Sequence, residues 1–150
     1  MDPANKDRIN HRVSREQQRE QRIMINDLTS TVIESAIKIH KALGPGLLES
    51  AYKECLAYEL IKKGLFVENE KAVPLIYEEV KLDCGYRLDL MINNELILEI
   101  KSVDAIADIH IAQVLTYMKL MNKKFGLLIN FNVPFLTDGI KRLINKFYKE

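Results

Sequence analysis

Hydrophobic residues recur every three or four positions in two stretches near the start of the chain. The first stretch begins at Ile23 and continues to Leu43, where Gly44-Pro45-Gly46 interrupts it, and the second runs from about Leu47 to Gly64. This spacing places apolar side chains on one face of a helix, and a glycine is a common residue just beyond a helix end. The domain is therefore predicted to open with two helices.

After Gly64 the pattern changes to short apolar and β-branched runs, which are typical of strands. These runs cover residues 65–67, 73–77, 86–92 and 96–103. A helical pattern returns over residues 106–121, residues 125–131 are expected to form a buried strand, and residues 137–148 are expected to form a C-terminal helix. The order ααββββαβα predicts an α/β protein of the α+β type, with a central mixed sheet flanked by helices.

Residues 1–22 differ in composition from the rest of the chain. They include only four apolar residues, together with six basic and four acidic ones. Such a segment buries too little apolar surface to fold alone. It is predicted to be a flexible polar arm, and residues 23–150 are predicted to form a single domain.

Overall composition excludes several classes of protein. The net charge is +1, which is unlike a strongly basic nucleic-acid coat protein, although a local basic groove remains compatible with it. The two cysteines, Cys55 and Cys84, form no CxxC pair, so neither a disulfide framework nor a cysteine zinc site is expected. An export signal and a long apolar run are both missing from the pattern. A cytoplasmic protein without a membrane span is predicted.

The most informative segment is the alternating hairpin formed by residues 86–101. A loop of three residues, 93–95, or a two-residue turn plus one bulged residue, pairs Ile92 with Leu96, Leu90 with Leu98, and Leu88 with Ile100, so that one face is wholly apolar. A two-residue loop would mix charge into that face, and it is therefore disfavoured. In the predicted register Asp89 lies opposite Glu99, Arg87 lies opposite Lys101, and Met91 lies opposite Ile97.

Two carboxylates in direct cross-strand positions repel each other unless a proton or a cation lies between them. Asp89 and Glu99 therefore suggest a divalent-metal site, and hard oxygen ligands favour Mg²⁺, with Mn²⁺ as its substitute. Lys101 lies two residues after Glu99, on the same side of the strand. An acidic residue two positions before a lysine occurs about twice by chance in this composition, and Glu79-Val-Lys81 is the other case. A solvated hairpin face with alternating charges explains these residues equally well.

Other polar residues lie on apolar helical faces. Glu49 shares a face with Tyr52 on the second helix, where the helix dipole alone also favours an acidic residue. His110, Gln113 and Tyr117 form a polar ridge on the third helix. His40 lies on the apolar face of the first helix and is expected to be a core or site-edge histidine rather than a metal ligand.

Several of these segments, taken in order, resemble a known family. Gly46-Leu-Leu-Glu49-Ser-Ala-Tyr52 is similar to the motif that gives the GxxExxY family its name, and this family resembles the PD-(D/E)xK nuclease superfamily. The resemblance covers roughly residues 25–145. It includes the following further segments: Ile39–Gly46, Tyr86–Asp89, Glu99–Lys101, His110–Tyr117 and Gly126–Pro134.

The resemblance implies a restriction-endonuclease-like core and a specific set of site residues. In that set Asp89 and Glu99 hold the metal with the Ile100 carbonyl, Lys101 positions the attacking water, and Glu49 is an additional acid at the metal. Gln113 is the polar residue supplied by the later helix. The remaining residues expected to line the substrate cleft are His40, Tyr52, Arg87, His110 and Tyr117.

The expected function is that of a Mg²⁺-dependent phosphodiesterase acting on nucleic acid, with DNA as the expected substrate. One alternative is a non-catalytic module of the same fold that binds nucleic acid or a protein, which the mild net charge favours. A hydrolase of small phosphate esters is a third possibility, since a fold does not select a substrate. A homodimer is expected on geometrical grounds, because two chains enclose duplex DNA more readily than one.

Overall fold

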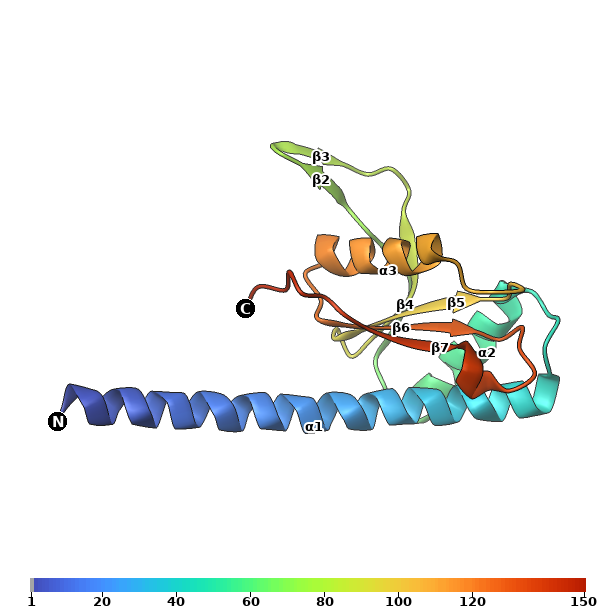
Figure 1. The fold of residues 1–150 in the computed structure, drawn as a ribbon. Coiled ribbons are helices and arrows are strands. Elements are labelled where there is room, and N and C mark those ends of the chain that lie inside the picture. Colours follow the sequence, from blue (N-terminus) through green and yellow to red (C-terminus); the bar gives the residue numbers. More distant parts are fainter. Residues whose placement is uncertain (1) are drawn as a thin grey trace. The chain divides into compact units, whose positions relative to one another are not determined.

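The computed structural model describes the backbone of residues 2–150 and the side chains of residues 2–4 and 15–150. The chain divides into two compact units, Met1–Ile33 and Glu34–Glu150. Helix α1 (Pro3–Leu43) begins in the first unit and ends in the second (Figure 1). The predicted flexible arm, residues 1–22, includes Met1 and side chains that lie outside the described residues, and its flexibility stays a prediction.

The two predicted opening helices are present. Helix α1 ends at Leu43, and α2 spans Glu49–Lys62. Between them Gly44 and Gly46 have φ angles of 72° and 97°. Glycine adopts this left-handed region without the steric cost that other residues meet there. The Gly-Pro-Gly turn therefore ends α1, as the sequence predicts.

Five strands form one mixed sheet in the order β1-β4-β5-β6-β7. Strands β5 and β6 are parallel, and the other neighbouring pairs are antiparallel. The strands have the following bounds: β1 Val67–Ala72, β4 Arg87–Ile92, β5 Leu96–Lys101, β6 Phe125–Asn130 and β7 Ile140–Ile144. The predicted fold class, a central mixed sheet with flanking helices, is confirmed.

A separate hairpin consists of β2 (Leu75–Tyr77) and β3 (Val80–Leu82). It projects from the body of the second unit (Figure 1). Helix α3 (Asp108–Leu120) connects β5 to β6, which a parallel pair requires. Among residues 2–150, no helix has the length and apolar character that crossing a membrane requires.

The helices supply the hydrophobic contacts that bury the sheet. Val114 and Met118 of α3 pack with Met91 and Ile97 of the central strands, and all four side chains are fully buried. On α2, Tyr52 stacks on Phe131, with ring centroids 4.4 Å apart and the rings nearly parallel. Phe131 directly follows β6. The sheet between β4 and β6 is thus fixed by α3 and by α2.

The predicted hairpin register is confirmed for three pairs, namely Leu90 with Leu98, Met91 with Ile97, and Ile92 with Leu96. Asn93 and Asn94 both have positive φ angles, near 51° and 55°, as a tight hairpin turn requires. The predicted loop of three residues, 93–95, therefore describes the observed connection.

The predicted C-terminal helix over residues 137–148 is wrong. A short 3₁₀ helix, η1 (Leu136–Gly139), is followed directly by β7, which pairs with β6 from Phe125↔Ile144 to Ile129↔Ile140. Apolar residues at 140, 143, 144 and 147 fit helical spacing, but the unpaired edge of β6 offers hydrogen bonds that this segment satisfies as a strand. Tertiary pairing therefore overrides the local pattern.

Candidate active site

The backbone ladder between β4 and β5 ends one position before the two acidic residues. Beyond the Leu90↔Leu98 pair, side chains take over the cross-strand hydrogen bonds. The backbone N–H of Asp89 donates to Oε1 of Glu99 at 2.9 Å, and the backbone N–H of Ile100 donates to Oδ2 of Asp89 at 2.8 Å. The two carboxyl groups are thus fixed by the opposing strand and lie close together between β4 and β5.

A second irregularity lies on the other side of Asp89. In the β1–β4 register, Asn69 pairs with Leu90 and Lys71 pairs with Leu88, so Glu70 is the residue opposite Asp89, but these two form no ladder pair. Glu70 has a φ of 51°, which is uncommon for a residue with a side chain. At Asp89, strand β4 therefore forms no ladder pair with either neighbouring strand. The carboxyl group of Asp89 can interact with residues from other elements.

Burial makes this acidic pair electrostatically costly. Glu99 is only 4% exposed, and burial, followed by repulsion from Asp89, raises its pKa from 4.5 to about 8. Burial also raises the pKa of Asp89, while the Ile100 N–H and the charges of Lys53 and Lys101 oppose this rise. The pair is thus short of positive charge near neutral pH, and a cation or a proton there would relieve the repulsion.

Two lysines face the acidic pair. Lys101 ends β5, and its positive charge lowers the pKa values of both Asp89 and Glu99. Lys53 of α2 acts on Asp89 as well, and its ammonium group forms an ion pair with Glu70 at 2.6 Å. Lys53 was not among the predicted site residues. It lies four positions after Glu49, on the same face of α2, and that spacing is the signal that could have revealed it.

Helix α3 contributes a hydrogen-bonded pair beside the acids. Tyr117 is 7% exposed, and its pKa is raised by burial and then by the nearby charge of Glu99. Nε2 of Gln113 donates to the Tyr117 hydroxyl at 3.2 Å. His110, the third member of the predicted ridge, instead accepts a hydrogen bond from the Ala107 N–H at 3.0 Å, at the start of α3. Its imidazole therefore satisfies a helix terminus.

Glu49 is the first residue of α2 and is partly buried. The hydroxyl of Ser102, directly after β5, donates to the Leu47 carbonyl at 2.6 Å and ties the start of α2 to the end of β5. Glu49 does not complete a preformed acidic cluster. Among the side chains of residues 2–4 and 15–150, no three His, Cys, Asp or Glu residues lie close enough together to hold a metal.

Three predicted cleft residues have other partners. Tyr52 is fully buried, so it has no surface with which to line a cleft, and its hydroxyl donates to the Gly44 carbonyl at 2.5 Å. Nε2 of His40 lies 2.7 Å from the Val133 carbonyl oxygen, which agrees with a core or site-edge histidine. Arg87 is exposed and donates to the Tyr86 carbonyl at 2.9 Å.

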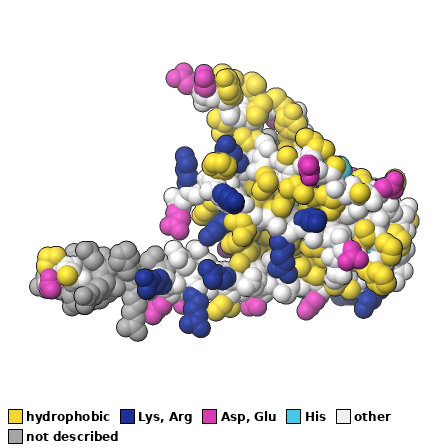
Figure 2. Space-filling view, in the orientation of Figure 1, with side chains coloured by type: hydrophobic (Ala, Val, Ile, Leu, Met, Phe, Trp, Pro, Cys, Tyr) yellow, Lys and Arg dark blue, Asp and Glu magenta, His cyan; other side chains and the backbone are white. Residues whose placement is uncertain are grey.

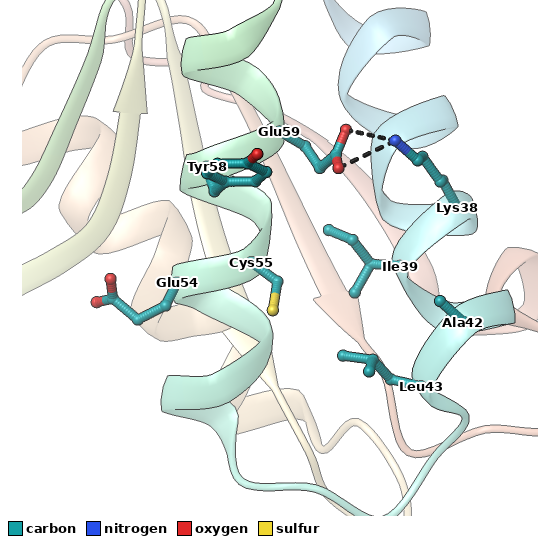
Figure 3. A pocket seen from close by; sticks show the side chains of 8 residues that line it. All are labelled: Lys38, Ile39, Ala42, Leu43, Glu54, Cys55, Tyr58 and Glu59. Carbon is teal, nitrogen blue, oxygen red and sulfur yellow. Dashed lines mark hydrogen bonds and ion pairs between the residues drawn. The ribbon is translucent and has the colours of Figure 1, made fainter.

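A groove of about 370 Å³ between α1 and α2 is separate from the acidic residues. Nζ of Lys38 donates to both carboxylate oxygens of Glu59 at 3.1 Å across this groove, and Cys55 points into it (Figure 3). Neither Asp89, Glu99 nor Lys101 lines it. The groove therefore adds no group to the candidate active site.

The donor set at the acidic pair fits a hard divalent cation. Asp89 and Glu99 supply carboxylate oxygens, and the Ile100 carbonyl lies on the same strand as Glu99, between it and Lys101. Oxygen ligands of this kind bind Mg²⁺ and Mn²⁺, which complete their coordination with water. Two fixed carboxylates are compatible with such an ion, since one or two protein carboxylates commonly hold Mg²⁺.

A mixed sheet whose central antiparallel pair opens around two acids and a lysine defines a restriction-endonuclease-like protein. The comparison with protein families agrees with this class. A family model described as the PD-(D/E)XK nuclease superfamily matches residues 26–143, and the chain belongs to that superfamily. Nucleases of this superfamily generally use divalent metals and bind nucleic acid. Searches of the curated proteins and of the solved structures gave no match.

Proposed function

We propose that this protein is a metal-dependent phosphodiesterase that cleaves nucleic acid, with DNA as the expected substrate. The observation that carries the proposal is the acidic pair itself. Asp89 and Glu99 are fixed by each other's strands in a buried, repulsive arrangement, with Lys101 beside them. A fold alone would not require this unfavourable arrangement, whereas phosphodiester hydrolysis makes use of each of its parts.

In the proposed mechanism Asp89, Glu99 and the Ile100 carbonyl would hold a Mg²⁺ ion, for which Mn²⁺ can substitute, and Glu49 would assist. A cation held there would supply positive charge that lowers the pKa of a coordinated water and offsets the charge that develops on the phosphate. Lys101 would orient the attacking water, whose oxygen bonds to phosphorus as the bond to the leaving oxygen breaks. The water would release a proton to solvent, and the leaving oxygen would take one up. Gln113 and Tyr117 border the site from α3. The resemblance of Gly46–Tyr52 to the GxxExxY motif supports the role of Glu49.

The experiment compares metal binding with cleavage in the same preparations. Calorimetric titration of Mg²⁺ and Mn²⁺ is expected to show binding to the wild type and loss of binding in Asp89→Asn. Lys101→Ala is expected to keep metal binding and lose cleavage of plasmid and single-stranded DNA. Lys81→Ala is the matched control, because Lys81 lies in the other acid-x-lysine tripeptide, on the exposed strand β3. Cleavage retained by Lys101→Ala would overturn its role.

A second candidate function is a non-catalytic binding module of the same fold. The observation that favours it is that no three of the described His, Cys, Asp and Glu side chains are arranged so that they could hold a metal ion together. This candidate predicts nucleic-acid binding with a steep salt dependence and no metal-dependent cleavage of any nucleic acid. A fluorescence-polarisation titration at several salt concentrations, run beside the cleavage assay, separates the two functions.

A homodimer and a cytoplasmic location stay predictions from the sequence. A dimer would let two acidic pairs approach opposite strands of a duplex. Light scattering coupled to gel filtration tests this directly. A mass near twice 17.4 kDa is expected, and a mass near 17.4 kDa would contradict the dimer.

A further inference from the structure

Positive charge is concentrated at one end of the sequence. From Lys119 to Glu150 there are seven Lys or Arg residues and two acidic ones, Asp138 and Glu150, which gives this segment a charge of +5. The whole chain has a net charge of only +1. The remainder is therefore net acidic, and the nearly neutral composition conceals a strongly basic segment. Such a distribution matters more for binding polyanions than the net charge does.

Two asparagines join the basic stretches of this segment into one surface. Asn145 is 5% exposed; its Nδ2 donates to the Lys123 carbonyl at 3.1 Å, and its backbone N–H donates to the Lys124 carbonyl at 2.9 Å. Asn122 forms a reciprocal pair with the backbone of Lys149, at 2.8 and 3.0 Å. The segment after β7 is thus fastened to the turn between α3 and β6.

We name this the C-terminal basic surface. It comprises Lys119, Lys123, Lys124, Lys146, Phe147 and Lys149. Lys and Arg side chains gather over this part of the molecule, where the C-terminal end of α3 meets the end of the chain (Figures 1 and 2). Because the hydrogen bonds of Asn122 and Asn145 hold its two halves together, the spacing of its charges is defined by the fold.

An aromatic ring stands among these lysines. Phe147 is 68% exposed, and Nζ of Lys119 lies 4.7 Å from the centroid of its ring. The ring borders a cavity of about 390 Å³ between α3 and residues 144–147, with Lys119 and Lys146 also in its wall. Exposure of the apolar phenylalanine ring to water does not stabilise the protein. The face of the ring is suited to stacking against a planar base.

We infer that the C-terminal basic surface binds single-stranded nucleic acid, with its lysines on the phosphates and a base stacked on Phe147. An acidic protein would use the lysines but would not require a flat ring among them. The inference rests on the proposed function, since it supplies a second contact for the nucleic acid that the acidic pair would cleave. It assigns that contact to α3 and the C-terminal segment, not to β4 and β5.

The test measures binding of a fluorescent oligothymidylate by anisotropy in EDTA, so that cleavage cannot occur. The triple variant Lys119→Gln/Lys123→Gln/Lys146→Gln is compared with Lys62→Gln/Lys63→Gln/Lys81→Gln, which removes the same charge from exposed positions elsewhere in the chain. We expect the first triple variant to bind at least about tenfold more weakly and to lower the salt slope by about 2, at roughly 0.7 per phosphate contact. The control is expected to change affinity much less.

Phe147→Leu tests stacking separately from charge. It keeps every lysine and removes the aromatic face on which a base would stack, so we expect roughly tenfold weaker binding with an unchanged salt slope. Thermal melting of each variant serves as the folding check, and Phe147→Tyr, which keeps an aromatic face, is expected to restore binding. Rescue by tyrosine would not follow from a purely structural role of the ring.

Two results would overturn the inference. One is equal loss of affinity in the two triple variants, which would indicate a diffuse charge effect. The other is competition by polyglutamate as strong as that by unlabelled oligothymidylate, which would indicate a general polyanion surface. Turnover of bis(p-nitrophenyl) phosphate reports the acidic pair alone. The basic-surface variants are expected to keep that turnover. Unchanged oligothymidylate binding in these variants would contradict this inference alone, whereas absence of turnover in the wild type would contradict the proposed phosphodiesterase.

Discussion

Replacing Glu99 with glutamine should stabilise the metal-free protein near neutral pH. Glu99 is almost fully buried beside Asp89, and its pKa is raised from 4.5 to about 8. Glutamine has the same shape and is neutral. Its side-chain oxygen can still accept the hydrogen bond from the Asp89 N–H, and its amide can donate to the Asp89 carboxylate. The substitution therefore removes the ionisable group and keeps the contacts.

The magnitude follows from the proton balance of folding. At pH 7 the unfolded chain has Glu99 ionised, whereas the folded chain holds a proton there because the folded pKa is about 8. Taking up that proton costs about 1.4 kcal/mol for each pH unit above the unfolded pKa of 4.5, or about 3 kcal/mol at pH 7. The stabilising contribution of this group is fully present below pH 4.5 and is lost as the pH rises to 8. Glutamine does not titrate, so the variant loses no stability at this position over that pH range.

Urea unfolding of both proteins in EDTA, followed by circular dichroism from pH 4.5 to 9, measures the difference in unfolding free energy. We expect Glu99→Gln to be about 3 kcal/mol more stable at pH 7, with a smaller advantage at lower pH. Glu95→Gln is the control, since Glu95 is exposed in the hairpin turn. If Glu99→Gln were no more stable than the wild type at any pH, the acidic pair would not carry the electrostatic cost assigned to it.

Two further predictions concern the scaffold that holds the site. Tyr52→Phe removes a buried hydroxyl that forms hydrogen bonds with two backbone groups of the turn before α2. Urea unfolding is expected to show a free energy of unfolding lower by about 1–3 kcal/mol. Tyr58→Phe, at an exposed tyrosine, is the control and is expected to change little. Gly139→Ala places a Cβ 2.2 Å from the Asn130 carbonyl oxygen, so thermal melting should show severe destabilisation; Gly126→Ala meets a flexible methionine sulfur at 2.8 Å and should cost less.

The hairpin that carries the acidic pair was predictable because its sequence permits only one satisfactory register. Alternating residues on both sides of Asn93-Asn94 give a wholly apolar set in one register and a mixed set in the other, and the observed pairs follow the first. The same register brings Asp89 and Glu99 together, as the side-chain hydrogen bonds between their strands show. The position of the candidate site could therefore be predicted from the local alternation of apolar and polar residues.

Other features depend on contacts between distant segments, and the local pattern does not contain them. Residues 140–144 have apolar spacing that suits a helix, and pairing with β6 makes them a strand. Lys53 reaches Asp89 only because α2 packs beside β1 and β4. Tyr52 fits a cleft-lining position on the helix, yet it stacks on Phe131, which lies 79 positions later in the sequence. Each of these outcomes depends on the assembled sheet.

The irregular backbone around Asp89 and the electrostatic cost of Glu99 have the same structural cause. Asp89 forms no ladder pair with either neighbouring strand, so its N–H and the N–H of Ile100 turn to carboxylate oxygens. Regular pairing would satisfy those N–H groups with carbonyls and leave the carboxyl groups without fixed positions. The fold thus exchanges two ordinary backbone hydrogen bonds for two oriented carboxylates. This exchange predicts that adding Mg²⁺ increases the stability of the folded protein. The increase is expected to be far smaller in Asp89→Asn.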